Sequence, residues 1–161
     1  MAANYEKARR AARDTLARFG MTTPPFDPEA IAEAMNVNVV YGRFAGGNAQ
    51  EIAGFLQFDP PRIVVNLDQP SNRKTFTIAH ELGHYILHQD YAHSQNYQVM
   101  PRNNYYDGLK PDEEKEADVF AANLLVPMKA LQRYRDVAST KELARLFAVS
   151  EDVILNRLKS S

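Results

Sequence analysis

Two histidines four residues apart, with a glutamate beside the first, form the segment of this sequence most able to do chemistry. The segment is His80-Glu81-Leu82-Gly83-His84. On a helix, residues four apart stack on one face about one turn apart, so two imidazole nitrogens could bind one zinc ion. Glu81, adjacent to the first histidine, could then hold a water at the ion and take its proton. The motif therefore predicts hydrolysis of a peptide-like bond.

The remaining sequence predicts an α+β fold that places this motif on a helix. Alternating or continuous apolar runs predict strands at 37–41, 52–58 and 62–67, which would form a small early sheet. Apolar residues at helical spacing predict helices at 4–19, 27–35, 73–88, 113–125, 141–147 and 151–159. Ser71 would cap the helix that carries the motif, residues 46–48 would form a turn, and residues 89–111 a long loop.

The length predicts a single domain over residues 1–161, built from three consecutive parts. A chain of 161 residues can bury a core without disulfides or structural metals. We expect N-terminal helices and the sheet in residues 1–70, and the zinc-site helices and loop in residues 71–127. Residues 128–161 would form a helical tail that resembles a helix-turn-helix.

The composition argues against several classes of protein. A net charge of −1 gives no global attraction to nucleic acid or to anionic membranes. The absence of cysteine excludes a disulfide framework and leaves nitrogen and oxygen as the ligands for zinc. No stretch has the apolar length of a signal peptide or a transmembrane helix, so we expect a cytoplasmic protein.

A catalytic zinc needs a third protein ligand, which we expect from the acidic helix downstream. Glu116 precedes Phe120 by one turn and so lies over the apolar face that must pack inward. A carboxylate on such a face is costly to bury unless it is paired or bound to metal, so Glu116 is the predicted third ligand. Glu113 is a weaker candidate on the same side, while Glu114 and Lys115 are expected to point to solvent.

Three segments together resemble the ImmA/IrrE family of metallopeptidases. Residues 73–84, which end in the motif and are followed by His88, are similar to the active-site helix of that family. Residues 116–127 resemble its second hallmark, at the expected distance along the chain, and residues 62–66 resemble the strand before the active-site helix. The matches extend over about residues 52–127, and the double hallmark is much more specific than the HExxH pattern alone.

The resemblance implies a gluzincin-like zinc site with His80, His84 and Glu116 as its ligands. Glu81 would be the general base. It also implies a protein substrate, a helix-turn-helix repressor of the Xre type, which is often encoded beside the protease. Members of the family commonly occur in mobile elements, toxin–antitoxin-like pairs and stress-response switches.

Three further residues could support the site from outside the ligand set. His88 lies one turn after His84 on the same face, at the end of the predicted helix. It could be an alternative third ligand, but we favour a role in supporting a ligand or in interacting with the helix dipole at the C-terminus. Asp118 could orient a ligand histidine or lie in solvent. Arg73 could anchor nearby carboxylates or be a solvated residue of the first helical turn.

Substrate-binding groups are less well defined by the sequence. The tetrahedral oxyanion of such a hydrolysis needs a donor besides the metal. The loop offers several suitable side chains, none of which the sequence singles out: His93, Tyr97, Tyr105 and Tyr106. An extended substrate could add as a strand beside residues 54–58, although an ordinary core strand is the simpler interpretation.

Residues 140–154 have the small residue, tight turn and apolar spacing of a helix-turn-helix. The second helix of such a unit presents its N-terminal residues to DNA, and here they are Glu151 and Asp152, which phosphates would repel. The basic residues Arg157 and Lys159 come late in that helix. We therefore expect a packing unit or a surface for a partner protein, and no direct binding of nucleic acid.

The motif thus predicts a zinc-dependent endopeptidase, and the resemblance implies that it cleaves an Xre-type repressor as a regulatory switch. The alternative is a regulatory or toxin-like protein that docks such a partner with little or no proteolysis. Nitrogen and oxygen ligands also admit manganese or iron in place of zinc.

Overall fold

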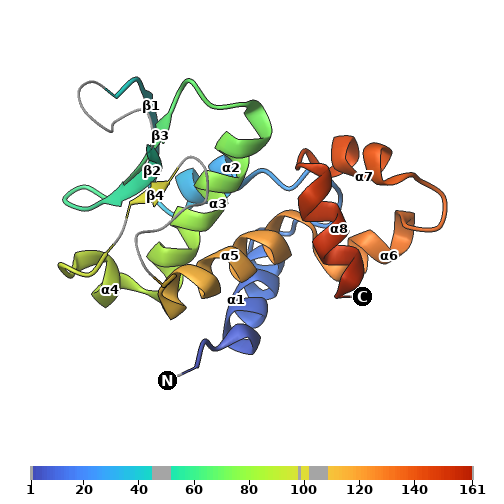
Figure 1. Cartoon of the computed structure of the whole chain (residues 1–161), viewed down its shortest axis with the longest axis horizontal. Coiled ribbons are helices and arrows are strands. Elements are labelled where there is room, and N and C mark those ends of the chain that lie inside the picture. The colour runs from blue at the N-terminus through green and yellow to red at the C-terminus, as the bar shows by residue number, and fades with distance from the viewer. Residues whose placement is uncertain (1, 45–51, 98, 102–108, 161) are drawn as a thin grey trace.

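A small mixed sheet lies at one end of the molecule (Figure 1). The computed structural model describes residues 2–44, 52–97, 99–101 and 109–160. Within these ranges one sheet has the order β1-β3-β2-β4, formed by β1 (Asn38–Gly42), β2 (Ile52–Gln57), β3 (Arg62–Asn66) and β4 (Met100–Pro101). β1 pairs with β3 in parallel, whereas β2 is antiparallel to both β3 and β4. The α+β prediction is confirmed, and the three predicted strands are correct to within one residue at each end.

Three helices pack in successive layers on the sheet. Helix α3 (Ser71–Leu87) packs against the sheet, α5 (Asp112–Leu125) packs against α3, and α1 (Tyr5–Arg18) packs against α5. Ile63 of β3, Leu82 of α3 and Phe120 of α5 are fully buried in one apolar cluster. Burial of each such side chain stabilises the fold by about 1.5–3 kcal/mol, so apolar packing fixes α3 and α5 against one another.

The first two helices start one residue after the predicted bounds, because the predicted first residues are their N-caps. Asn4 caps α1 and Asp27 caps α2 (Pro28–Ala34), each by accepting a backbone N–H with its side chain. The prediction that Ser71 caps α3 is wrong: Ser71 is the first helical residue, and Pro70, with φ of −57°, is the N-cap. Among the described residues, every helix is too short or too polar to traverse a lipid bilayer.

The single long loop predicted over residues 89–111 is interrupted by regular structure. Helix α4 (Gln89–His93) follows α3 directly, and β4 pairs with β2 at Ile52 and Gly54. Gly54 therefore has a partner strand on both sides, as an ordinary internal strand would, whereas Phe55, Leu56 and Gln57 pair with β3 alone. The predicted turn at 46–48 and the loop residues 98 and 102–108 lie outside the described residues.

The C-terminal helices gather at the end of the molecule farthest from the sheet (Figure 1). They are α6 (Met128–Tyr134), which the sequence pattern did not predict, α7 (Thr140–Phe147) and α8 (Glu151–Lys159). Phe147 and Ile154 are fully buried in the same apolar cluster as the core of α3 and α5. The buried Arg157 donates its Nε–H to the Val126 carbonyl at 2.9 Å. The tail therefore packs against the end of α5, in line with the packing role expected for it.

Gly54 is the point of closest approach between the sheet and the helix that carries the motif. A Cβ at this position would lie 2.6 Å from Thr77 Cγ2 of α3 and 2.6 Å from the Val64 carbonyl oxygen of β3. Since a backbone atom cannot move aside as a flexible side chain can, this space must remain empty for α3 to sit where it does.

We predict that Gly54→Ala lowers the free energy of unfolding by about 1–3 kcal/mol through overpacking. The thermal midpoint should fall by about 2–4 °C for each kcal/mol lost, as measured by circular dichroism. Gly42→Ala in β1 is the matched control, because nothing lies within 4 Å of the added Cβ there. Equal melting temperatures for the two variants would contradict this account of the α3–sheet contact.

Candidate metal centre

The motif histidines lie side by side in the interior of the molecule. His80, Glu81 and His84 are all on α3 with no exposed surface. The two imidazole rings are 4.8 Å apart between centroids and meet edge to face. One potential ligand atom from each of the three residues lies within 4.8 Å of the others. Helical spacing therefore brings the predicted residues together as expected.

A carboxylate of α5 joins the two histidines, and it belongs to Glu114. Its Oε1 lies 2.9 Å from His80 Nε2, and its Oε2 lies 2.9 Å from His84 Nε2. The expectation that Glu114 points to solvent is wrong, since its side chain is fully buried. The physical reason is the helical phase of α5. Its buried residues include Glu114, Ala117, Ala121 and Leu124, at spacings of three and four residues, together with Phe120 and Leu125.

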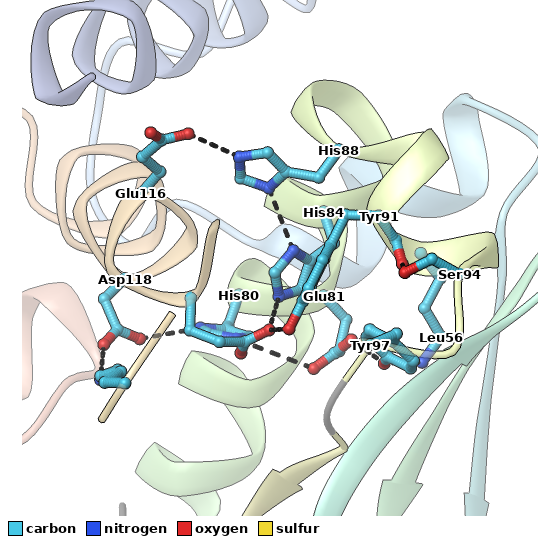
Figure 2. A network of polar contacts seen from close by, with 12 residues as sticks. Leu56, His80, Glu81, His84, His88, Tyr91, Ser94, Tyr97, Glu116 and Asp118 are labelled. Carbon is cyan, nitrogen blue, oxygen red and sulfur yellow. Dashed lines mark hydrogen bonds and ion pairs between the residues drawn. The ribbon is translucent and has the colours of Figure 1, made fainter. Parts of the chain in front are cut away.

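Glu116, the predicted third ligand, is not brought to the histidine pair. Its Oε1 lies 2.7 Å from His88 Nε2, and its Oε2 accepts the backbone N–H of Asn4 at 2.7 Å. His88 Nδ1 in turn lies 3.0 Å from His84 Nδ1, as Figure 2 shows. Both ring nitrogens of His88 are thereby engaged, so His88 is not placed as a third ligand either.

Asp118 contacts the first histidine from the side opposite Glu114. Its Oδ1 lies 2.8 Å from His80 Nδ1, and its other oxygen forms an ion pair with Lys110. A carboxylate in this position fixes the ring orientation of a metal-binding imidazole and leaves Nε2 free to act as the ligand. Asp118 is thus found at His80, a predicted ligand, and is only partly exposed.

Glu81 has one oxygen engaged and one oxygen open. Oε1 accepts the hydroxyl hydrogen of Tyr97 at 2.6 Å, and the Tyr97 oxygen accepts the Leu56 N–H of β2 at 2.7 Å. Oε2 is buried, has no hydrogen-bond partner in the described part of the chain, and lies 3.9 Å from His80 Nε2. Without a bound cation, burial raises the pKa of Glu81 to about 8.

Burial and hydrogen bonding oppose one another on the groups around this pair. Burial lowers the pKa of His80, but hydrogen bonds to Asp118 and Glu114 outweigh burial and raise that pKa to about 10. Burial prevails at His84 and lowers its pKa. Burial raises the pKa of Glu114, but the two histidines outweigh it and hold that pKa well below its usual range. Without a bound cation, the centre thus carries a proton on His80 opposite a charged Glu114.

These side chains fit a divalent metal ion. His84 Nε2 is buried 2.9 Å from a Glu114 oxygen, yet the contact lacks hydrogen-bond geometry. Among the described residues, Glu81 Oε2 is the second buried atom of the centre that has no hydrogen-bond partner. A buried polar atom without a partner costs about 1–3 kcal/mol, which an ion between the two nitrogens and the carboxylate would offset. Two imidazoles and one carboxylate form a ligand set typical of catalytic zinc.

Two tyrosines that the sequence did not assign to the centre support its carboxylates. The Tyr91 hydroxyl donates to Glu114 Oε2 at 2.7 Å, as the Tyr97 hydroxyl does to Glu81. Both rings line a hollow of about 500 Å³, together with Gln95, Asn96, Pro111 and Glu113. No spacing rule links a tyrosine after the helix to a carboxylate on α5, so the sequence carried no signal for this contact.

The remaining residues considered from sequence lie elsewhere. Arg73 donates to the Pro101 carbonyl at 2.9 Å and so joins α3 to β4. The His93 ring stacks on Phe58 at 3.7 Å between centroids. Tyr105 and Tyr106 lie outside the described residues.

Known proteins share both the sequence and the fold of this chain. It matches the IrrE N-terminal-like domain of the Peptidase M78 family over residues 32–159. It is 30% identical over 116 residues to "Uncharacterized immunity region protein 2" of Bacillus phage phi105, and the alignment covers 71% of this chain and 67% of that protein. A solved structure, "Mycobacterium tuberculosis transcriptional regulator", shares the fold with a TM-score of 0.66 at 18% identity. That match covers 95% of this chain and 46% of the other, so this chain spans about half of its length. The resemblance seen in the sequence is therefore confirmed: the chain belongs to the IrrE N-terminal-like, Peptidase M78, family.

Proposed function

We propose that this chain is a zinc-dependent endopeptidase that acts on a protein substrate in the cytoplasm. The observation that carries the proposal is the position of Glu114, whose buried carboxylate contacts the Nε2 atoms of His80 and His84. Two imidazoles and a carboxylate, with the carboxyl of Glu81 beside them, are the ligands and the base of a mononuclear zinc hydrolase. Membership of a peptidase family supports the same class of reaction.

We assign His80, His84 and Glu114 as the ligands of the ion, in place of the predicted Glu116. Each histidine would bind through Nε2, because its Nδ1 is engaged by another side chain. When bound, zinc in such a site polarises a carbonyl and lowers the pKa of water.

Glu81 would move the proton in both halves of the reaction. Tyr97 holds Oε1 in place, which leaves Oε2 directed to the centre as the atom that accepts a proton from the attacking water. Once protonated, the same carboxyl can then deliver the proton to the departing amine. Because Glu81 is fully buried, the transferred proton is shielded from bulk solvent.

The hollow beside Tyr91 and Tyr97 is our proposed approach for the substrate. Gln95, Asn96 and Glu113 give it side-chain hydrogen-bonding groups, which suit the backbone of an extended peptide. The hydroxyls of its two tyrosines contact Glu114 and Glu81, so the hollow lies next to the centre.

The substrate we propose is a helix-turn-helix repressor of the Xre type. The matched relatives are named as a phage immunity-region protein and a transcriptional regulator, and these names support a partner connected with repression. Cleavage of such a partner would act as a regulatory switch, in a pairing like that of a toxin and its antitoxin.

Removal of the assigned carboxylate ligand should weaken metal binding most. We predict that Glu114→Ala lowers the zinc affinity far more than Glu116→Ala or Glu113→Ala, because only Glu114 contacts both histidines. Competition with a chromophoric chelator measures the affinities, and Glu113→Ala, on the same helix, is the matched control. A larger loss in Glu116→Ala than in Glu114→Ala would restore Glu116 as the ligand.

Zinc binding near neutral pH should release protons. A histidine must be neutral to bind a metal, whereas His80 has a pKa of about 10 and is protonated at neutral pH before the ion binds. We expect about one proton per ion from this residue. Isothermal titration calorimetry in buffers with different ionisation enthalpies gives the number, and binding heats independent of the buffer would contradict the assigned state of His80.

Loss of the base should abolish turnover while the metal remains bound. We predict that Glu81→Gln binds zinc but cleaves an Xre-type repressor encoded beside it about 10²–10⁴ times more slowly than the unmodified protein does. Mass spectrometry of the products should show one defined cut by the unmodified protein. Full activity in Glu81→Gln would refute the mechanism. An intact repressor after long incubation with the unmodified, zinc-loaded protein would favour the docking alternative.

A further inference from the structure

We propose that His88 and Glu116 are positioning residues, which link the metal ligand His84 to the start of helix α1. The inference rests on the proposed metal centre but not on peptidase activity. It gives a role to two side chains that the ligand set does not use.

Three contacts form one continuous chain, visible in part in Figure 2. His84 Nδ1 lies 3.0 Å from His88 Nδ1, and His88 Nε2 lies 2.7 Å from Glu116 Oε1. Glu116 Oε2 accepts the backbone N–H of Asn4 at 2.7 Å. Since Asn4 is the N-cap of α1, the chain runs from the centre to the first turn of that helix.

The donors and acceptors of this chain have one consistent arrangement when His84 binds metal. His84 then uses Nε2 as the ligand and carries its hydrogen on Nδ1, which donates to His88 Nδ1. The hydrogen of a neutral His88 must therefore be on Nε2, where it donates to Glu116. The two oxygens of Glu116 accept from His88 and from the Asn4 backbone. Every link thus fixes the tautomer of the ring before it.

The two ligand histidines are consequently supported in different ways. His80 Nδ1 meets the carboxylate of Asp118 directly, and Lys110 pairs with that carboxylate. His84 reaches its carboxylate, Glu116, only through the intervening ring of His88. His88, the C-cap of α3, lies one turn after His84 and supplies the ring between His84 and Glu116.

Zinc affinity tests the link because loss of a partner that orients a ligand lowers affinity by about 10–100-fold. We expect a loss in this range for His88→Ala and for Glu116→Ala, and a smaller loss for the conservative Glu116→Gln. The double variant should lose no more affinity than His88→Ala alone, because both residues act through one chain. His93→Gln is the matched control, since that exposed histidine stacks on Phe58 outside the chain of contacts.

The cobalt-substituted protein gives a second readout, which a general loss of stability would not change. Its visible absorption should shift in His88→Ala and Glu116→Ala and remain unchanged in His93→Gln. Unaltered zinc affinity and spectrum in variants that fold, or additive losses in the double variant, would overturn the proposal. If His88→Ala does not fold, Glu116→Gln alone decides by the same two measurements. An unmodified protein that binds no zinc would refute the metal centre itself, which separates the two failures.

Discussion

The contact between α3 and α5 places a buried carboxylate between two buried histidines, and the candidate centre depends on that contact. Gly83, inside the motif, lies at the point where the helices meet, because a Cβ there would be 2.9 Å from Phe120 Cδ1. Phe120 and Glu114 share α5, so the approach permitted at Gly83 also sets how closely Glu114 reaches the histidines. Gly83 thus has a packing role, alongside the chemical roles that we assign to His80, Glu81 and His84.

Charges that are buried or partly buried in this region are stabilised by pairing, which explains why several acidic side chains can lie in or beside the interior of a small protein. Glu114 contacts both motif histidines, Asp118 pairs with His80, and Glu116 pairs with His88. Glu81 differs from them, since one of its oxygens has no hydrogen-bond partner among the described residues. The carboxyl that is least compensated is therefore the one to which we assign proton transfer.

The sequence predicted the elements well and the ligand set incompletely. Local patterns were sufficient for the strands and for the motif, because alternation and the spacing of four residues are properties of one segment. The choice between Glu114 and Glu116 depended on the rotation of α5 about its axis. Phe120, considered alone, placed Glu116 on the buried face, because Glu116 lies one turn before it. The buried residues Ala117, Ala121 and Leu124 instead place Glu114 on that face. The tyrosine contacts could not be predicted at all, because only the tertiary fold brings those residues to the carboxylates.

The central claim is that one metal ion binds between α3 and α5 through two histidines and Glu114. Anomalous diffraction at the zinc edge, from crystals of the zinc-loaded protein, tests it most directly. The account predicts one strong peak about 2.0–2.2 Å from the Nε2 atoms of His80 and His84 and from a carboxylate oxygen of Glu114. A peak coordinated by Glu116 or His88 in place of Glu114, or no peak at the two histidines, would contradict it.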